Sequence, residues 1–577
     1  MRAPLLLVVL LVLVSLATPA MATPSQASQP TSFSLPTADL AEVDLQTLPA
    51  LDSRALDAAE RAARRNAPIG AVAPRFAEPV PVDFTPYDSG TWQALDDGSR
   101  LWRLRLRSPG AVNLNLALIP FRPPEGARLW VYGPDRAVVH GPFVGHRDHD
   151  LPELWTPLVP GEEIVVELVL PASVADADPG VTISRLHHGF RGLRQATQVD
   201  TRDGQGSCNN DVACAEADPW RDQTRAVAWF TLNGIGACSG QLINNTLQDG
   251  RPYFLTAFHC GVSANNASTT VFYWQVESPT CGALSGGDLS KTTNGATWRA
   301  DDPATDFALL ELPAQPPADF DVYYVGWDIS GAVPQGAVGI HHPELQEKAI
   351  SFDTNPLTTN SGVPGLTDGT HWRVGNWEDG TTEPGSSGSC IYDPTNQLCV
   401  GILTGGFASC QDLREDYYGK LAVAWSGGST TTRLQSWLDP AGLGVTSFSG
   451  YDPSDAPTGT TCTPDADTMC LRDGRFLIEV TYSDFDGNVD AAQVANAGTS
   501  DSGLFWFFQP DNWELLVKVL DGCGVNGNYW VFAAGTTNVG WLLEITDLDN
   551  GTRWTGTNPL GQPAPAITDT NAFATCP

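Results

Sequence analysis

The stretch YFLTAFHCG occupies residues 253–261, and its apolar and aromatic residues lead directly to a histidine. A short run of this kind, rich in residues of high β-propensity, predicts a buried strand that ends at His259. A second stretch, ATDFALLEL (304–312), places Asp306 in front of another apolar strand. Both patterns predict a β-rich domain in which a polar residue stands at the end of a core strand.

A third stretch, EPGSSGSC (383–390), has the composition of a tight turn. Gly385 and Gly388 lack a β-carbon, so the backbone around Ser387 is free to adopt conformations that other residues rarely reach. This turn is expected to expose the Ser387 hydroxyl and to direct the amides of Gly385 and Ser387 toward one point.

Histidine, aspartate and serine together suit nucleophilic catalysis at a peptide bond. A serine hydroxyl becomes a nucleophile when a neighbouring imidazole takes its proton and a carboxylate orients that imidazole. Taken singly, each residue has an ordinary structural explanation, as a core histidine, a strand cap or part of a flexible loop. Their joint order and flanking strands favour a catalytic triad of His259, Asp306 and Ser387, with the amides of Gly385 and Ser387 as oxyanion hole.

Short strand-like segments separated by Pro and Gly recur along most of the chain, which is typical of β-sandwiches and β-barrels. Helices are expected only over 53–66 and at 430–438. The predicted order of units is a signal peptide (1–22), an N-terminal region (23–202) made of a loose leader (23–80) and a β-sandwich (81–202), a β-barrel domain (203–450), a linker (451–461) and a β-sandwich stapled by disulfides (462–577).

The first residues and the cysteine count predict export. An apolar run over 5–16 precedes the A-x-A cleavage signal at 20–22, and no later stretch stays apolar for about 20 residues, so we expect a secreted protein with no membrane partner. Twelve cysteines without a C-x-x-C pair predict disulfides rather than metal thiolates. The net charge of −34 disfavours nucleic acid as a partner.

Residues 203 to about 448 resemble the bacterial lysyl endopeptidases, a branch of the trypsin-like serine proteases. The resemblance implies a chymotrypsin-like double β-barrel, and it assigns the same triad, with Gly385 in the oxyanion hole. It also implies that the sandwich at 81–202 is a propeptide, which inhibits by covering the cleft or assists folding. Besides the stretches quoted above, the matching ones are GSCNNDVAC (206–214), GIHHPELQEKAIS (339–351), EDYYGK (415–420) and RLQSWLDP (433–440).

The resemblance also implies a disulfide pattern. The family's three bridges fall on Cys208 with Cys410, Cys214 with Cys281, and Cys238 with Cys260. Cys390 and Cys399 remain, and we expect them to close the short loop after the nucleophile. This fourth bridge departs from the family, which more usually has proline where Cys390 stands.

Substrate selection is expected to depend on Asp416, with Thr404 and Gly405 also in the substrate-binding site. Many trypsin-like proteases carry the selecting acid just before the nucleophile, where this chain has the uncharged Thr381. The family's acid comes from a later strand and falls on Asp416, which implies cleavage after lysine; the alternative is a solvated loop acid. Thr404 stands where the family has a histidine, and no matching tryptophan is found, so arginine is also a candidate.

Alignment with the family on GSCNNDVAC implies that the mature enzyme begins at Asp203, so a cut follows Arg202, and self-cleavage there is our hypothesis. In trypsin the new amino terminus pairs with an aspartate just before the nucleophile, but this chain has Ser386 there. The switch used by trypsin therefore cannot form, and we expect the prosegment instead to inhibit by covering the cleft or to assist folding, as the resemblance implies.

Two other motifs invite a metal site, and neither supports one. His341 and His342 are neighbours on a predicted strand, so their side chains point to opposite faces and a structural role is favoured. The stretch SDFDGNVD (483–490) lacks the glycine and glutamate of an EF-hand. We therefore expect no metal, no cofactor, a monomer, and proteins or peptides as substrates. Two alternatives stay open: a serine endopeptidase that cuts after non-basic residues, and a non-catalytic exported adhesin on a degenerate protease scaffold.

Overall fold

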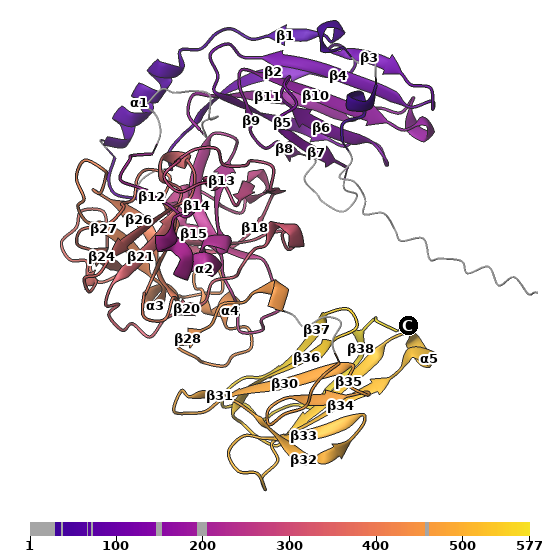
Figure 1. The fold of residues 1–577 in the computed structure, drawn as a ribbon, viewed down its shortest axis with the longest axis vertical. Helices are drawn as coiled ribbons and strands as arrows, with labels where there is room; N and C mark the ends of the chain where they lie inside the picture. The colour runs from indigo at the N-terminus through magenta and orange to yellow at the C-terminus, as the bar shows by residue number, and fades with distance from the viewer. Residues whose placement is uncertain are drawn as a thin grey trace, which may run out of the picture.

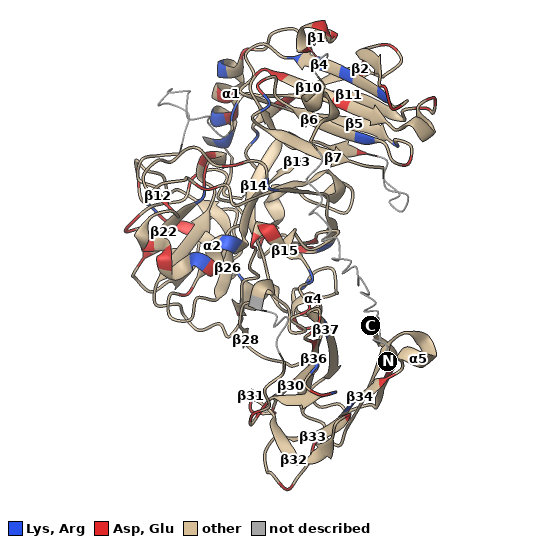
Figure 2. Ribbon diagram, turned by 45° about the vertical axis from the view of Figure 1, so that its right-hand side comes forward, with Lys and Arg blue, Asp and Glu red and all other residues tan. Residues whose placement is uncertain are grey.

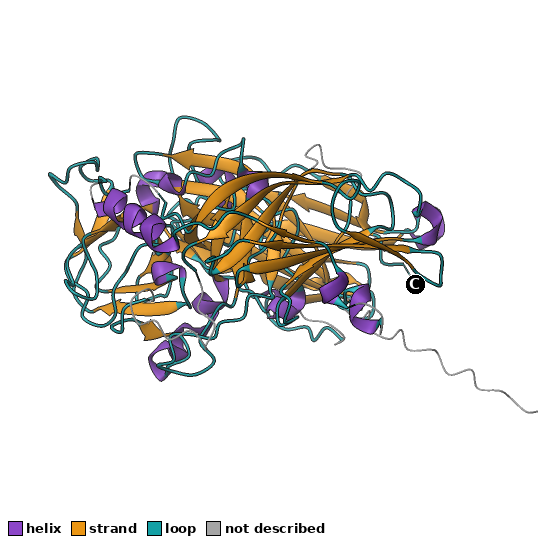
Figure 3. Cartoon of the chain, turned by 90° about the horizontal axis from the view of Figure 1, so that it is seen from above, coloured by secondary structure: helices purple, strands orange, loops and turns teal. Residues whose placement is uncertain are grey.

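The computed structural model describes residues 29–35, 39–65, 67–70, 73–145, 153–192, 205–455 and 461–576. The predicted signal peptide and the predicted cut after residue 202 lie outside the described residues. Strands dominate the described part of the chain, with short helices mostly at the periphery (Figure 3), so the predicted all-β class is confirmed. Within these ranges, no helix combines the length and the apolar character needed to cross a membrane.

The chain forms an N-terminal domain (39–192), a central domain (205–448) and a C-terminal domain (461–576), which follow one another from top to bottom in Figure 1. Acidic residues occur in all three domains (red in Figure 2), in keeping with the negative net charge of −34.

The N-terminal domain is a sandwich of two sheets whose apolar faces enclose Leu104, Leu116 and Val166. Its first sheet contains β1 (Leu45–Thr47), β3 (Thr91–Ala94), β4 (Arg100–Arg107), β6 (Arg128–Tyr132), β7 (Val139–Phe143) and β10 (Glu163–Leu170). Its second sheet contains β2 (Ala77–Phe84), β5 (Asn113–Phe121), β8 (Leu154–Trp155), β9 (Val159–Pro160) and β11 (Val181–Gly189).

The expectation of a loose leader over 23–80 is corrected for residues 39–65. Here β1 pairs in parallel with β4, and helix α1 (Ser53–Arg65) follows it. The leader is ordered because β1 satisfies its backbone hydrogen bonds at the sandwich. The predicted helix over 53–66 thus corresponds to α1.

The central domain consists of two sheets that share one core containing Phe254, Leu309, Trp327 and Ile340. The first sheet has the order β17 (Thr292–Asn294), β16 (Val271–Trp274), β13 (Val227–Leu232), β14 (Gly236–Leu242), β15 (Tyr253–Ala257), β19 (Phe307–Glu311), β18 (Thr297–Asp302). The second has the main order β12 (Asn210–Asp211), β22 (Ala349–Asp353), β21 (Ala337–His341), β25 (Cys390–Tyr392), β26 (Cys399–Gly406), β27 (Asp416–Lys420), β24 (His371–Val374), β23 (Thr358–Thr359), with β20 (Trp327–Asp328) and β28 (Ser447–Phe448) beside it.

The N-terminal domain packs directly on the central domain. Phe76 and Trp155 join Trp229 and Tyr273 of the central domain in one buried apolar cluster. The Tyr273 hydroxyl also accepts a hydrogen bond of 2.8 Å from the amide of Leu158. Burying large aromatic side chains of both domains in one cluster makes this a stable contact.

A buried arginine fastens α1 to the same face. The Arg191 side chain is 2% exposed, and its guanidinium contacts the carboxylate of Asp57 on α1 and, at 3.1 Å, that of Glu344 in the central domain. Arg191 thus links α1, the end of the N-terminal sandwich and the central domain. Removing either acid would leave buried charge unpaired. Helix α1, with its blue arginines in Figure 2, therefore lies against the central domain.

The C-terminal domain is a second sandwich, and it contacts the central domain through Leu542, which lies in the central core. The Ser483 hydroxyl also donates to the Leu443 carbonyl at 2.8 Å. One sheet contains β29 (Met469–Leu471), β30 (Phe476–Ser483), β31 (Val489–Ala491), β36 (Gly540–Asp547) and β37 (Thr552–Asn558); the other contains β32 (Gln493–Thr499), β33 (Ser502–Trp506), β34 (Leu515–Asp521), β35 (Tyr529–Gly535) and β38 (Ile567–Phe573). The remaining α-helices are α2 (Arg221–Ala226), α3 (Leu421–Ala424), α4 (Gln435–Leu438) and α5 (Cys523–Asn526), so the helix expected over 430–438 is limited to α4.

Candidate active site

His259 and Asp306 meet because their strands are paired. Strand β15 ends at Ala257, which faces Phe307 of β19, so the residues just outside this pair become neighbours. The Nδ1 atom of His259 lies 2.8 Å from Oδ2 of Asp306, and the His259 amide donates to Oδ1 at 2.9 Å. Asp306 reaches this geometry with a φ of 58°. Both side chains are buried, so the carboxylate fixes the imidazole in position and in tautomer.

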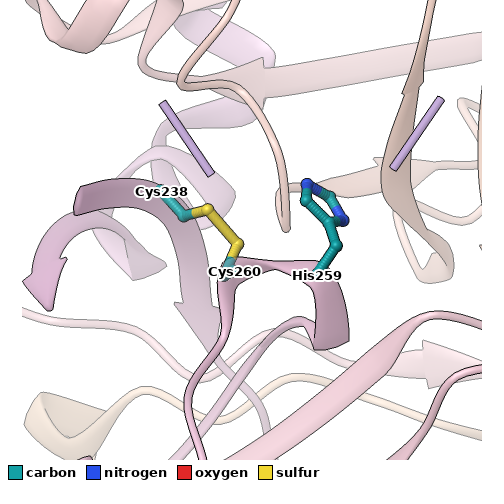
Figure 4. Close-up of side chains that lie close together, drawn as sticks. All are labelled: Cys238, His259 and Cys260. Atoms are coloured by element: carbon teal, nitrogen blue, oxygen red, sulfur yellow. A yellow bond between two sulfur atoms is a disulfide. The ribbon is translucent and has the colours of Figure 1, made fainter. Parts of the chain in front are cut away.

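A disulfide lies beside this histidine. Cys238 of β14 is bonded to Cys260, next to His259 on the turn after β15 (Figure 4). Their sulfur atoms and an imidazole nitrogen come close enough for a metal site. The sulfurs are bonded to each other and are not thiolates, so this group is not a set of metal ligands.

The Ser387 turn lies against the end of β15. A β-carbon on Gly388 would lie 2.9 Å from the amide nitrogen of Ala257, two residues before His259. The Ser387 carbonyl accepts a hydrogen bond of 2.9 Å from the amide of Ser239. Among the described residues, the structure gives no hydrogen bond between the Ser387 hydroxyl and His259. The turn that carries Ser387 therefore lies beside the end of β15, but the hydrogen bond between Ser387 and His259 is not formed. Catalytic hydrogen bonds are often long in enzymes without substrate.

Asp416 is buried at the start of β27, in contrast to the alternative of a solvated loop acid. Its Oδ2 atom accepts two hydrogen bonds, of 2.7 Å from Nε1 of Trp377 and of 2.6 Å from the Thr382 hydroxyl. Its Oδ1 atom is buried and makes no hydrogen bond of normal geometry among the described residues. Burial raises the pKa of Asp416 to about 6, and hydrogen bonding from Thr382, from Trp377 and from the Ala408 backbone opposes this rise. The Oδ1 atom therefore has no side-chain donor and keeps lone-pair capacity for a cation.

Sequence reasoning missed Trp377 and Thr382. Thr382 directly follows Thr381, the position where many trypsin-like proteases carry their selecting acid. This neighbouring position was the only signal in the sequence that pointed to Thr382. Trp377 comes from the loop after β24, and nothing in its sequence context distinguishes it from a core tryptophan.

Thr404 has an unforeseen histidine beside it. Nε2 of His371, on β24, lies 3.1 Å from the Thr404 hydroxyl, and both residues are buried. Burial lowers the pKa of His371 to about 4, although the nearby Asp306 carboxylate opposes this shift. A neutral imidazole therefore lies next to Thr404 on the side of Asp306, which the sequence alone did not indicate.

A segment of the N-terminal domain lies on these same residues. A β-carbon on Gly70 would lie 2.6 Å from the Thr404 methyl carbon and 3.8 Å from Oδ2 of Asp306. A β-carbon on Gly405 would lie 3.7 Å from a methyl carbon of Ile69. The short segment 68–70, just after α1, therefore covers the predicted substrate-binding residues.

The cysteines pair within their own domains. The structure joins Cys208 with Cys410, Cys214 with Cys281, Cys238 with Cys260, Cys390 with Cys399, Cys462 with Cys470 and Cys523 with Cys576. A cavity of about 1360 Å³ lies elsewhere, between the N-terminal and central domains, and contains none of the predicted site residues.

Two family models match this chain. Residues 47–190 match the lysyl endopeptidase N-terminal domain, and residues 203–419 match the lysyl endopeptidase C-terminal domain. A lysyl endopeptidase of Pseudomonas aeruginosa is 29% identical over 415 residues, which cover 66% of this chain and 83% of that protein.

Solved structures give weaker similarity. A Glu endopeptidase is 18% identical with a TM-score of 0.25, covering 39% of this chain and 93% of its own. The HtrA-type protease AlgW, with a bound tripeptide, is 15% identical with a TM-score of 0.28, covering 61% of this chain and 99% of its own. Nothing further is inferred from similarity at this level.

Proposed function

The chain belongs to the lysyl endopeptidase family and is therefore a serine endopeptidase, and we propose that it is secreted and cuts after lysine with His259, Asp306 and Ser387 as its catalytic triad. The observation that carries the triad is the contact of His259 with both oxygens of the buried Asp306 carboxylate.

In this mechanism Ser387 Oγ attacks the carbonyl carbon while His259 Nε2 takes its proton. Asp306 holds the proton on Nδ1 and stabilises the imidazolium that forms. The amides of Gly385 and Ser387 stabilise the oxyanion. His259 then gives its proton to the leaving amine, which departs and leaves an acyl group on Ser387. A water molecule, deprotonated by His259, releases that acyl group and restores the serine.

Asp416 is proposed to select the residue before the cut, called P1. Its Oδ2 is already held by Trp377 and Thr382, so only Oδ1 is left to meet the substrate. A lysine ammonium is a compact charge that one oxygen satisfies, whereas the arginine fork is best matched by both carboxylate oxygens. This count of oxygens favours lysine over arginine. A non-basic P1 residue would leave Oδ1 buried and unpaired.

The N-terminal domain is proposed to inhibit the enzyme as its propeptide. Segment 68–70 covers Thr404, Gly405 and the side of Asp306, so a substrate cannot lie there at the same time. The buried pairing of Arg191 with Asp57 and Glu344 holds α1, and hence this segment, in place.

Digestion of a peptide mixture tests the function, with cut sites identified by mass spectrometry. The secreted wild type is compared with Ser387→Ala and with Asp416→Asn. We expect cuts after lysine that disappear in the serine variant and lose their preference for lysine in the aspartate variant. Cuts after lysine that persist in purified Ser387→Ala would overturn the triad, and serine-dependent cuts at unrelated residues would overturn the role of Asp416.

A further inference from the structure

His341 and His342 stand together at the end of β21, fully buried, and the proposed mechanism uses neither side chain. His341 contacts the segment 381–387, which contains the nucleophile and which we call the nucleophile loop, and the His342 amide contacts Ser239, which is itself hydrogen-bonded to that loop. The contacts are specific enough to assign the direction of each hydrogen bond.

His341 joins the two ends of the nucleophile loop. The Ser351 hydroxyl donates to the Thr381 carbonyl at 2.9 Å, so its oxygen must accept from Nε2–H of His341, 3.1 Å away. Nδ1 is then the acceptor, and the Ser386 hydroxyl donates to it at 2.8 Å. Ser386 Oγ in turn accepts from the Glu383 amide at 3.2 Å. Every donor in this series of hydrogen bonds has one acceptor, so only the tautomer of His341 with its proton on Nε2 fits.

The His341 ring has to stay neutral for this arrangement. Burial lowers the pKa of His341 to about 3, so the ring carries no charge at any pH at which an exported enzyme works. A protonated ring would have no acceptor for the Ser386 hydroxyl.

Ser239 supports the same loop from the other sheet. Its amide donates to the Ser387 carbonyl at 2.9 Å, and its hydroxyl donates to the Gly385 carbonyl at 2.8 Å. The same hydroxyl accepts from the His342 amide at 3.0 Å. The backbone on both sides of the oxyanion hole is thus tied to β14 and to the end of β21.

We propose that His341 is a positioning residue that, through Ser386, holds the nucleophile loop in its reactive conformation. This proposal rests on the proposed function, because it assumes that Ser387 is the nucleophile. Ser386 stands where trypsin has the aspartate that pairs with the new amino terminus, and here its partner is a histidine that is present before any cut. The loop is therefore formed while the N-terminal domain is still attached.

Three variants of the secreted protein test the proposal. His341→Phe removes both ring nitrogens at similar volume, Ser386→Ala removes the hydroxyl that contacts the ring, and His341→Gln retains one donor and one acceptor. Ser389→Ala is the matched control, because the Ser389 hydroxyl is buried in the same region without a hydrogen-bond partner among the described residues. Each variant is assayed for its rate of reaction with a small fluorophosphonate and for kcat/KM on a lysine peptide, and thermal unfolding confirms that it is folded.

We expect both rates to fall by the same factor, about 10²-fold, in His341→Phe and in Ser386→Ala, because a displaced loop misplaces the nucleophile and the oxyanion donors alike. His341→Gln should react at least about tenfold faster than His341→Phe, and a double variant that combines His341→Phe with Ser386→Ala should be no slower than either single one. A loss confined to the lysine peptide would overturn the proposal, since the small fluorophosphonate does not need the lysine pocket.

Folded His341→Phe and Ser386→Ala that react as fast as Ser389→Ala would also overturn it. If His341→Phe does not fold, Ser386→Ala and His341→Gln decide. Failure of the proposed function has a different signature: wild type and Ser387→Ala would then be equally unreactive toward the fluorophosphonate.

Discussion

Asp416→Asn is expected to lower kcat/KM for lysine substrates by about a hundredfold to a few thousandfold. Asp416 is 1% exposed, so a lysine ammonium that reaches it leaves water and depends on the carboxylate. Breaking one partner of a buried ion pair costs about 3–5 kcal/mol, and each 1.4 kcal/mol is about a tenfold change. The two donors on Oδ2, from Trp377 and Thr382, would also hold the asparagine carbonyl and turn its NH₂ group toward the ammonium.

The assay compares kcat/KM on two peptides that differ only at P1, lysine or alanine. Glu415→Gln is the matched control, because it removes the neighbouring, partly exposed acid and leaves Asp416 intact. For the wild type, the lysine-to-alanine ratio should fall as the pH drops through about 6, where Asp416 takes up a proton in the free enzyme. An Asp416→Asn enzyme that retains the lysine-to-alanine ratio of Glu415→Gln, within a factor of three or so, would refute the reasoning.

Three further predictions concern stability and control. Asp416→Asn should raise the free energy of unfolding of the empty enzyme at pH 8 by on the order of 3 kcal/mol in chemical denaturation, because the raised pKa of Asp416 in the folded state favours folding at low pH and this contribution is lost as the pH rises through about 6. A neutral asparagine avoids the cost of the buried charge, and equal stability of the two proteins at pH 8 would contradict this. Gly70→Val should raise the rate at which the uncut precursor cleaves a lysine peptide by about tenfold or more, because Gly70 has a φ of 68° and no room for a β-carbon; cleavage as slow as in the parent would mean that segment 68–70 does not block the proposed substrate-binding residues. Leu542→Ala should destabilise the protein by about 2–5 kcal/mol, whereas Val525→Ala, at a side chain 76% exposed, should leave unfolding nearly unchanged; equal effects would exclude Leu542 from the central core.

Local pattern was sufficient for the strands that carry the predicted triad. The apolar run before His259 and the one after Asp306 become β15 and β19, and because these strands pair, the two polar residues meet. A prediction of this kind succeeds because a buried strand is specified by its own residues. The turn around Ser387 was predictable for the same reason, since its glycines have φ values of 104° and 88° that other residues rarely adopt.

Residues that act through tertiary contact carried no such signal. His371 and Trp377 look like ordinary core residues in the sequence, and only the placement of β24 and the loop after it beside β27, which in turn pairs with β26, brings them to Thr404 and Asp416. The position of segment 68–70 was equally hidden, because it depends on where α1 and the N-terminal sandwich dock on the central domain. Sequence pattern specifies elements, whereas docking depends on surfaces that distant elements build together.

The placement of these contacts bears on how the proposed inhibition by the N-terminal domain would be released. The aromatic cluster around Phe76 and Trp229 and the ion pairs of the buried Arg191 are made by residues that precede or follow the connection over residues 193–204 in the sequence. Cutting that connection breaks none of these contacts and does not move segment 68–70 from the cleft. Because the nucleophile loop is already hydrogen-bonded through Ser239 and His341, it requires no rearrangement either. We therefore expect the cut alone to yield an inactive two-chain complex, and activity to appear only when the N-terminal domain is itself degraded or dissociates.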